Sequence, residues 1–461
     1  METDLDLVRA YDNVHWMHPW CDLEAPGQHN LSIVTAADGI YIRDETGRRL
    51  IDGPGGMWCV QVGYGNRKIA RAIADQALDM PYMSPYSMTA APSARLARKL
   101  AELAPGDLDH VFFTTGGSTA VESAIRFVHF RNNLIGKPEK KLILAREDSY
   151  HGSTYLTASL SGKVGNKAYF DHITDGIAFA ASVNRYRFAR DMDPAAFCDQ
   201  RIAELELQIL AIGPERIAAF IAEPVQASGG VIVAPEGYLA RAFELCRKHD
   251  ILTISDETVT GFGRLGHWFS SKDVFGIEPD ILITAKGLTS GYQPLGACLI
   301  SKRLMGDITG ERAKGLWFAH GFTYSGHPVA CAAALANIEV MEELDLNAHV
   351  RRIAPLFQER MQALRALPIV GDVRGLGLVG CVDCVIGRDD RDPWNPKHAL
   401  GKRIDAHCQR LGLVVRPIIN MCVFSPPLVI TEPEIERMFD ILEQGLRATQ
   451  DDLVKEGIWR G

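Results

Sequence analysis

Short apolar runs alternate with helical segments through the middle of the chain, and this alternation constrains the fold more than any other feature. Helical spacing over 93–103 precedes a strand-like run at 111–114, and a second helical segment at 120–130 follows it. Such alternation predicts an α/β fold whose mostly parallel sheet is covered by helices. Later runs are short and β-branched, as strands buried on both faces should be: 142–145, 218–222, 251–255 and 281–284. Ligands of such sheets bind beyond the carboxyl ends of the strands.

The two ends of the chain have a different pattern and predict a smaller second domain. From about residue 335, long helical segments are followed by alternating strands at 373–382 and 413–416. Near the N-terminus, 39–52 predicts two short strands joined at a turn-forming Glu-Thr-Gly. We therefore predict three parts: an N-terminal segment, 1–60, that packs with the small domain; a large α/β domain, 61–334; and a small α+β domain, 335–461.

Charge and hydropathy argue against several kinds of partner. The chain has 49 basic and 57 acidic residues, a net charge of -8, and so lacks the excess of positive charge that nucleic acid or an anionic membrane requires. The first residues contain no basic segment followed by an apolar one, and no apolar stretch reaches the roughly 18 residues of a membrane span. We expect a cytoplasmic protein that binds neither nucleic acid nor membrane.

Two short motifs resemble binding sites but lack the necessary context. Gly375, Gly377 and Gly380 spell the GxGxxG of dinucleotide-binding proteins, yet the following residues alternate like a strand, whereas that motif must open a helix. A nicotinamide oxidoreductase is therefore a disfavoured alternative. Cys381 and Cys384 form one CxxC with no second pair and no nearby histidine pair, so we expect no metal site.

A candidate anion site follows the first strand of the α/β region. Residues 114–120, Thr-Thr-Gly-Gly-Ser-Thr-Ala, lie between this strand and the next helix. Glycines allow close approach of the backbone, and a helix N-terminus offers N–H groups to a phosphate. No lysine follows, which disfavours ATP. An ordinary helix cap would explain the same residues.

A carboxylate and an amine follow two later strands. Asp256 ends the strand near 251–255, and Lys286 follows the strand at 281–284, so both would face the ligand crevice. A buried ion pair or a solvated lysine would explain them equally well. Together with a phosphate site, however, they match the needs of pyridoxal phosphate: a lysine for the Schiff base, an acid for the pyridinium nitrogen and a clamp for the phosphate.

These residues resemble the class III pyridoxal-phosphate aminotransferases of fold type I, and among them the omega-transaminases that use pyruvate. The resemblance implies a ping-pong transfer of an amino group from an amine or ω-amino acid to a small α-keto acid, with pyruvate as the expected acceptor. It covers nearly the whole chain, and its pieces occur in the family order: Met57-Trp-Cys-Val-Gln-Val-Gly-Tyr-Gly, Thr115-Gly-Gly-Ser, Ser149-Tyr-His-Gly-Ser, Ala222-Glu-Pro-Val-Gln, Asp256-Glu-Thr-Val-Thr-Gly-Phe-Gly-Arg, Thr284-Ala-Lys-Gly, Gly321-Phe-Thr-Tyr-Ser-Gly-His-Pro and Val373-Arg-Gly-Leu-Gly-Leu.

The resemblance implies a role for each residue that would hold the cofactor ring. Lys286 would form the Schiff base and then act as base and acid in the proton shift. Asp256 would pair with the pyridinium nitrogen. Tyr150 would stack on one face of the ring and Val259 would press on the other. Glu223 and Gln226 would orient Asp256 or the ring hydroxyl.

The phosphate would be bound by two chains. Gly117 and Ser118 match the family's phosphate-binding positions, and Thr323 matches a threonine that reaches the phosphate from the neighbouring subunit. The resemblance thus implies that a homodimer is the smallest complete unit. A tetramer of two such dimers would satisfy the same requirement.

Substrate-binding positions are implied as well. Arg416 matches an arginine that swings in to clamp a carboxylate and swings out for uncharged amines. Members that act on ornithine, acetylornithine or γ-aminobutyrate carry a glutamate where this chain has Ser228. Trp58 and Tyr86 would form an aromatic wall that favours amines with an apolar substituent, although a purely structural role would also explain them.

Thr119 and Thr258 depart from the family pattern, which has glutamate and valine there. We expect neither substitution to touch a group assigned to the cofactor. An aminomutase, racemase or decarboxylase of the same fold would need the same Lys286 and Asp256, so these two residues leave such enzymes open as alternatives. Arg416 favours transfer because it provides for a second, carboxylate-bearing substrate.

Overall fold

A seven-stranded sheet forms the centre of the larger lobe, with the strand order β4-β12-β11-β10-β7-β5-β6. The computed structural model describes residues 4–21, 23, 31–387 and 395–461. Only β12 runs antiparallel to its neighbours in this sheet, which confirms the predicted mostly parallel α/β fold. The strands are β4 (Leu108–Thr114), β5 (Leu142–Arg146), β6 (Ile177–Ala180), β7 (Ile217–Ala222), β10 (Leu252–Asp256), β11 (Ile281–Thr284) and β12 (Gly296–Ser301).

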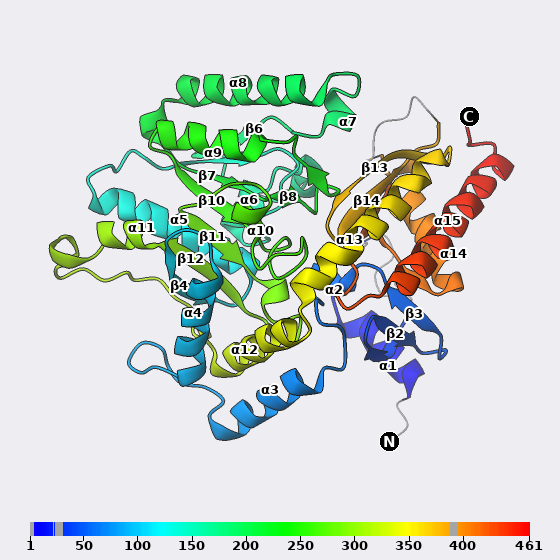
Figure 1. Ribbon diagram of the computed structural model, residues 1–461, viewed down its shortest axis with the longest axis horizontal. Helices are drawn as coiled ribbons and strands as arrows, with labels where there is room; N and C mark the ends of the chain where they lie inside the picture. The colour runs from blue at the N-terminus through cyan, green and yellow to red at the C-terminus, as the bar shows by residue number, and fades with distance from the viewer. Residues whose placement is uncertain (1–3, 22, 24–30, 388–394) are drawn as a thin grey trace.

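Helices cover both faces of this sheet, as Figure 1 shows. Strand β11 illustrates the reason, because all of its side chains are buried: Ile281 and Ile283 pack with helix α5, whereas Leu282 belongs to the core that α4 and α12 complete on the opposite face. The main helices of this lobe are α3 (Arg67–Asp79), α4 (Ala91–Leu103), α5 (Gly117–Leu134), α8 (Pro194–Ile212), α9 (Tyr238–Lys248) and α12 (Pro328–Glu343).

The smaller lobe is built from both ends of the chain. Strand β3 of the N-terminal segment pairs in parallel with β15, through Ile51 with Leu413. Such pairing supports the predicted packing of the N-terminal segment, while the exact domain limits stay predictions; α12 continues unbroken across 334–335. The strands are β1 (Val34–Asp38), β2 (Tyr41–Asp44), β3 (Arg49–Asp52), β13 (Val370–Leu376), β14 (Val379–Cys384), β15 (Leu413–Val414), β16 (Arg416–Ile418) and β17 (Met421–Phe424), and the helices are α13 (Leu346–Ala363), α14 (Leu400–Leu411) and α15 (Glu432–Lys455).

Several short elements complete the described chain. A small hairpin of β8 and β9 lies beyond β7, and its second strand precedes α9. The remaining elements of at least four residues, with the two strands of this hairpin, are α1 (Leu5–His15), α2 (Gly55–Trp58), α6 (Tyr155–Leu160), α7 (Arg185–Phe188), α10 (Ser270–Asp273), α11 (Lys302–Asp307), η1 (Val164–Lys167), η4 (Gly310–Ala313), β8 (Val225–Gln226) and β9 (Ile232–Val233).

The GxGxxG motif forms a β-hairpin turn. Gly375 pairs with Gly380, and Leu376 with Val379 forms the last pair before the turn. Gly377 lies in this turn with φ +58°, where an added Cβ would come within 2.6 Å of the Arg264 carbonyl oxygen. The motif therefore opens no helix, as its context predicted, and offers no pyrophosphate-binding N-terminus. Cys381 and Cys384 lie on β14 as buried free thiols.

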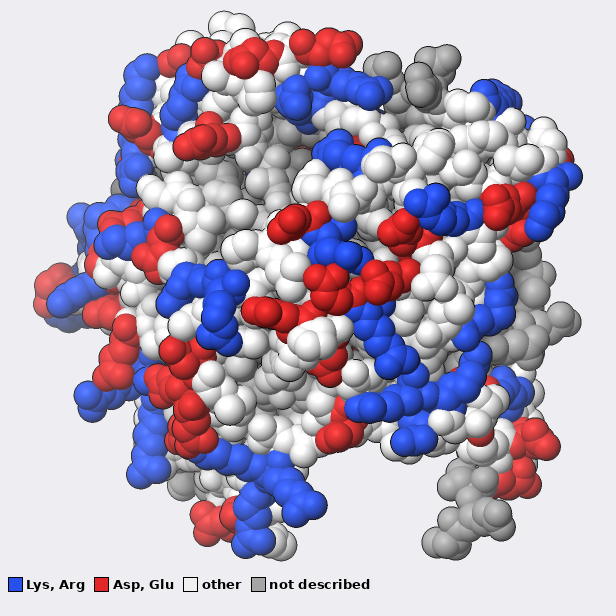
Figure 2. Space-filling view, turned by 45° about the vertical axis from the view of Figure 1, so that its right-hand side comes forward, with Lys and Arg blue, Asp and Glu red and all other residues white. Residues whose placement is uncertain are grey.

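None of the helices that the structure describes is long and apolar enough to span a membrane. On the face shown in Figure 2, basic and acidic side chains are interspersed rather than gathered by sign. Mixed charge of this kind gives no extended positive surface on that face for a polyanion.

A buried carboxylate next to Asp256 fixes the loop that follows β10. Both oxygens of Glu257 accept hydrogen bonds from the backbone and hydroxyl groups of Ser270 and Ser271, at 2.5–2.8 Å, and Thr260 adds another at 3.1 Å. We expect Glu257→Ala to lower the free energy of unfolding by about 2–4 kcal/mol, because several buried donors lose their acceptor. The melting temperature at a fixed scan rate measures this effect. Glu278→Ala, which removes an exposed partner of Lys272, is the matched control, and equal losses would contradict the prediction.

Candidate active site

The carboxyl ends of the parallel strands converge on one cavity of about 220 Å³. Asp256 is the last residue of β10, Glu223 follows β7 and Lys286 follows β11. The loop after β5 contributes Tyr150 to the same cavity, as strand-end geometry predicts. Residues far apart in the sequence thus line one space.

Lys286 is held in an unusual backbone conformation at the cavity wall. Its φ is +45°, and its Nζ lies 5.0 Å from the centroid of the Trp58 ring. Among the described residues, Nζ has no hydrogen-bond acceptor. Burial lowers the pKa of the Lys286 amine, against the opposing effect of the Asp256 carboxylate. A lysine with a lowered pKa is suited to form a Schiff base with a carbonyl compound.

Asp256 is fixed by hydrogen bonds on both of its oxygens. Its Oδ2 lies 2.8 Å from Nδ1 of His151, and its Oδ1 accepts from the backbone N–H and the hydroxyl of Thr258, at 3.2 and 2.5 Å. Both Asp256 and His151 are buried and line the cavity. The carboxylate could therefore hold a protonated ring nitrogen in a fixed position.

His151 is a site residue that we did not predict from the sequence. Its Nε2 is buried and has no hydrogen-bond partner within the described part of the chain. The sequence did point to His151, because this residue directly follows Tyr150 in one of the motifs quoted for the family. Spacing alone could not show that its ring turns toward Asp256.

Our expectation that neither substituted threonine touches a group assigned to the cofactor is wrong for Thr258. Its hydroxyl donates to Asp256, and its side chain lies 3.1–3.2 Å from where a Cβ on Gly117 would stand. Valine at this position could make no such hydrogen bond. Thr119 instead donates to the carbonyl oxygen of Gly116, at 2.9 Å, within the turn that begins α5.

The part of the cavity wall around Gly117 and Ser118 has the features of a phosphate site. Helix α5 begins at Gly117 without a side-chain cap, so its first N–H groups remain available beside Ser118. Gly117 and Gly152 both allow close approach: a Cβ on Gly152 would stand 2.4 Å from the Ser118 hydroxyl oxygen. Ser118 in turn accepts from the backbone N–H of Ser153, at 3.1 Å. Free helix N–H groups, a hydroxyl and glycines fit a phosphate-bearing cofactor.

Three other predicted cofactor residues also lie at the cavity: Tyr150, Val259 and Glu223. Glu223 accepts a hydrogen bond from the Tyr150 backbone N–H at 2.9 Å, and burial raises the pKa of its carboxyl group to about 7, with nearby Asp256 acting in the same direction. Gln226 is not a lining residue; its Nε2 donates to the Glu147 carbonyl at 2.8 Å.

Arg416 lines the cavity on the side of Trp58. Its guanidinium carbon lies 5.0 Å from the centroid of the Trp58 ring, and the group contacts the sulfur of Met57. No carboxylate of the described chain pairs with Arg416, and burial lowers the pKa of its guanidinium. The nearby Ser228 offers only a hydroxyl to the cavity. An arginine without an acidic partner can bind a substrate carboxylate by donating two parallel hydrogen bonds to it.

Two residues near this wall were missed by sequence reasoning. Lys163 donates to the Ser228 carbonyl at 2.8 Å and to its hydroxyl at 3.2 Å, and burial lowers the pKa of the Lys163 amine to about 8. Trp20, from the N-terminal segment, also lines the cavity. No spacing or strand-end rule points to either residue, because both come from irregular segments.

Tyr86 and Thr323 lie outside the cavity formed by their own chain. Tyr86 is 75% exposed, and Thr323 is exposed with its carbonyl oxygen bonded to the hydroxyl of Tyr82 at 2.9 Å. These positions stay predictions for a site that a second chain would complete.

A lysine, a fixed carboxylate and a phosphate cradle at one sheet edge define a pyridoxal-phosphate site, and comparison with known proteins identifies the family. Residues 23–446 match the family model of class III aminotransferases. The putrescine–pyruvate aminotransferase of Pseudomonas aeruginosa is 38% identical over 443 residues, covering 96% of each chain. Gamma-aminobutyrate transaminase 1 of Oryza sativa subsp. indica is 38% identical over 422 residues, covering 91% of this chain and 82% of that one.

Solved structures agree with this assignment. The omega transaminase from Pseudomonas jessenii, crystallised in complex with PMP, superposes with a TM-score of 0.92 at 36% identity, covering 96% of this chain and 98% of that one. An (S)-enantioselective omega-transaminase from Thermomicrobium roseum gives 0.92 at 35% identity, covering 98% and 100%. The chain belongs to the class III aminotransferases: it is a transaminase whose cofactor is pyridoxal 5'-phosphate. The alternatives of a mutase, racemase, decarboxylase or nicotinamide oxidoreductase are set aside accordingly.

Proposed function

We propose that this aminotransferase moves an amino group from an amine or ω-amino acid to a small α-keto acid, with pyruvate as acceptor. The observation that carries this proposal is the guanidinium of Arg416, which faces the same cavity as Lys286 and has no acidic partner among the described residues. An unpaired, partly buried guanidinium favours binding of a carboxylate. The name of the Pseudomonas aeruginosa relative, a putrescine–pyruvate aminotransferase, supports pyruvate.

The catalytic roles follow from the chemistry at each position. Bound pyridoxal phosphate supplies the carbonyl that takes up the amino group and a ring that disperses negative charge. Lys286 would hold the cofactor covalently and, once released, move a proton from its Nζ, for which a pKa lowered by burial is suitable. Asp256, held by His151 and Thr258, would keep the ring nitrogen protonated.

Substrate selection would depend on the wall beside Arg416. With Ser228 in place of the glutamate found in family members that use ornithine or γ-aminobutyrate, the guanidinium has no acidic partner there to neutralise it. It would therefore be available for pyruvate. Trp58, only 3% exposed, would contact the apolar part of an amine donor.

A second copy of the chain would complete the site. Thr323 and Tyr86 are exposed and lie outside the cavity of their own chain, as expected of residues that serve a neighbouring subunit. A homodimer would place Thr323 at the cofactor phosphate and Tyr86 near the substrate. Light scattering of the holoenzyme would report the dimer mass if this proposal is correct.

Product analysis tests the proposed reaction. The holoenzyme is incubated with a simple aryl-alkyl amine, a diamine or an ω-amino acid, each with pyruvate or with 2-oxoglutarate, and alanine and glutamate are quantified by chromatography. We expect alanine to form faster than glutamate with every donor that reacts. Glutamate formed at a higher rate than alanine would contradict the assignment of pyruvate.

Replacement of Arg416 separates the two substrates. Arg416→Ala should raise KM for pyruvate about 10–100-fold, the loss expected for a charge-assisted hydrogen-bonding pair, and change KM for an uncharged amine far less. Steady-state kinetics measured with each substrate in turn give both values. The control is Arg416→Lys, which keeps the charge but not the planar fork and should give an intermediate KM. Equal changes for pyruvate and the amine would show a purely structural role.

A further inference from the structure

A second cavity, of about 370 Å³, lies between the two lobes and shares no lining residue with the active site. One wall is the segment that follows β6, helix α7 and the residues after it, with Arg185 and Arg190. The other wall belongs to β13 and the turn before it, with Arg365, Asp372 and Arg374. Four arginines and one aspartate therefore provide the charges that line this cavity.

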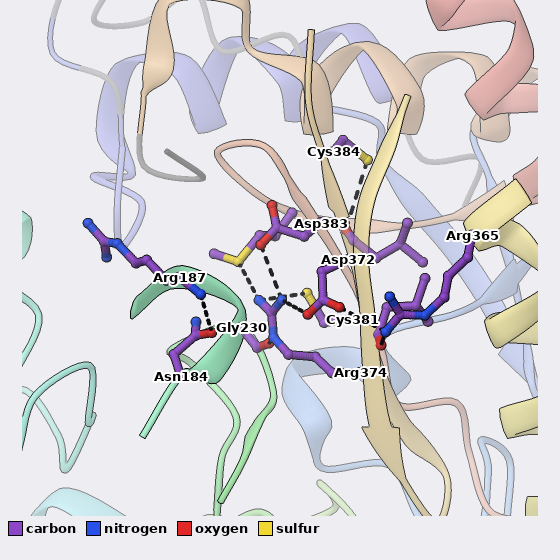
Figure 3. Close-up of polar contacts among 12 residues, drawn as sticks. Asn184, Arg187, Gly230, Arg365, Asp372, Arg374, Cys381, Asp383 and Cys384 are labelled. Atoms are coloured by element: carbon purple, nitrogen blue, oxygen red, sulfur yellow. Dashed lines mark hydrogen bonds and ion pairs between the residues drawn. The ribbon is translucent and has the colours of Figure 1, made fainter. Parts of the chain in front are cut away.

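The acidic groups on the β13 side are already paired. Asp372 accepts from Arg365 at 2.8 Å and from Arg374 at 2.9 Å, and Arg374 also contacts Asp383 at 3.2 Å. Figure 3 shows Arg374 between the two aspartates, with Arg365 on the far side of Asp372. Two carboxylates thus balance the charge of the two arginines of this wall, but Nη1 of the half-exposed Arg365 donates no hydrogen bond within the described residues and can still bind an anion.

The arginines on the opposite wall have no such compensation. Arg185 donates only to carbonyl oxygens, those of Arg190 at 2.9 Å and Met192 at 2.8 Å. The guanidinium carbon of Arg190 lies 5.8 Å from the centroid of the Tyr186 ring. Within the described residues, neither arginine forms an ion pair with a carboxylate, so the cavity retains two uncompensated positive charges.

We propose that this cavity binds a small oligoanion, with two or more phosphate or carboxylate groups, between Arg190 on one lobe and Arg365 on the other. Guanidinium groups present planar sets of donors that match such oxyanions, and two walls call for at least two anionic groups on the ligand. The cavity volume is sufficient for a molecule of the size of pyrophosphate or citrate. A bound anion would connect the larger lobe to the smaller one.

The proposed site adjoins a turn that leads to the active site. Arg374 donates from Nε to the Gly230 carbonyl oxygen at 2.7 Å. Gly230 has φ +102°, and an added Cβ would meet the Met421 sulfur at 2.4 Å, so the turn is tightly packed. Ser228, two residues earlier, lines the catalytic cavity. Anion binding at one end of this turn would therefore stabilise a segment that the active site uses.

Calorimetry of the holoenzyme at constant ionic strength tests the proposal, with pyrophosphate and citrate as separate probes. Bound cofactor occupies the phosphate cradle of the active site, and the same titrations in an Arg416→Ala background remove the carboxylate-binding group there, so that the active site competes for neither probe. We expect one saturable site per chain for at least one probe, and a melting temperature that rises with its concentration. Binding of pyrophosphate alone would identify a phosphate ligand, and binding of citrate alone a carboxylate ligand.

Matched variants locate the binding. Arg190→Gln and, separately, Arg365→Gln should weaken binding at least about tenfold, whereas Arg98→Gln, which removes an exposed arginine paired with Glu102, should not. Because the Arg190 guanidinium donates no hydrogen bond among the described residues, its variant should keep the melting temperature of the parent without anion. Absence of saturable binding with both probes, or unchanged affinity in both variants, would overturn the proposal.

Discussion

Lys286→Ala should reduce transamination at least about 10³-fold, the largest loss expected of any single substitution in this chain. Among the described residues that line the cavity, the amine of Lys286 is the one group that could both hold the cofactor covalently and carry the proton between carbon atoms. Alanine removes both capacities and leaves the phosphate cradle intact. Initial rates of alanine formation from an amine and pyruvate measure the loss.

The same variant should still bind pyridoxal phosphate non-covalently. Denaturation should release the variant's cofactor even after treatment with borohydride, whereas borohydride should fix the cofactor to Lys286 of the parent protein. The control is Lys272→Ala, which removes an exposed lysine paired with Glu278 and should keep parental rates. Substantial transamination by Lys286→Ala would show that another residue performs the chemistry.

Asp256→Asn should lower kcat about 10²–10³-fold, as is typical when one preorganised electrostatic partner is removed. The carboxylate is buried and held by His151 and Thr258, so it retains its position and its negative charge beside the ring nitrogen. An amide of the same shape cannot stabilise a proton on that nitrogen. The rate of bleaching of the cofactor by a saturating amine isolates this step from binding of pyruvate.

The same change from carboxylate to amide at an exposed position serves as the control. Asp75→Asn removes an exposed carboxylate that pairs with Arg71 on a surface helix, and it should leave kcat unchanged. His151→Gln should give a smaller loss than Asp256→Asn, because the histidine acts through the aspartate. Near-normal kcat in Asp256→Asn would refute the role of the carboxylate in protonating the ring.

Much of the larger lobe was predictable because its strands are buried on both faces. Runs such as 218–222 and 281–284 are short and almost wholly apolar, as strands covered on both faces of a sheet are. Strand direction was not predictable: β12 is buried along its whole length, as β11 is, yet it runs antiparallel to its neighbours. Besides the two strands predicted over 39–52, the N-terminal segment contains β1, which was missed because its residues are mostly exposed and give no apolar alternation.

The site was predictable where a strand end positions the side chain. Asp256 is the last residue of β10, and Lys286 lies two residues after the neighbouring β11, so the sheet alone brings them to one edge. Thr258 and Lys163 were missed because their contacts depend on loop paths and on side-chain direction, which spacing does not determine. Tyr86 and Thr323 depend on a second chain, and a single sequence carries no geometric signal for where that chain lies.

The absorbance spectrum of the holoenzyme, recorded before and after addition of an amine and then of pyruvate, tests the central claim most directly. We expect the visible band of the lysine-bound cofactor to disappear with the amine, as the amino group passes to the cofactor, and to return with pyruvate as alanine is formed. A band that bleaches but is not restored by pyruvate, while 2-oxoglutarate restores it, would contradict the proposed acceptor. A protein that shows no such band after incubation with pyridoxal phosphate would contradict the role of Lys286 itself.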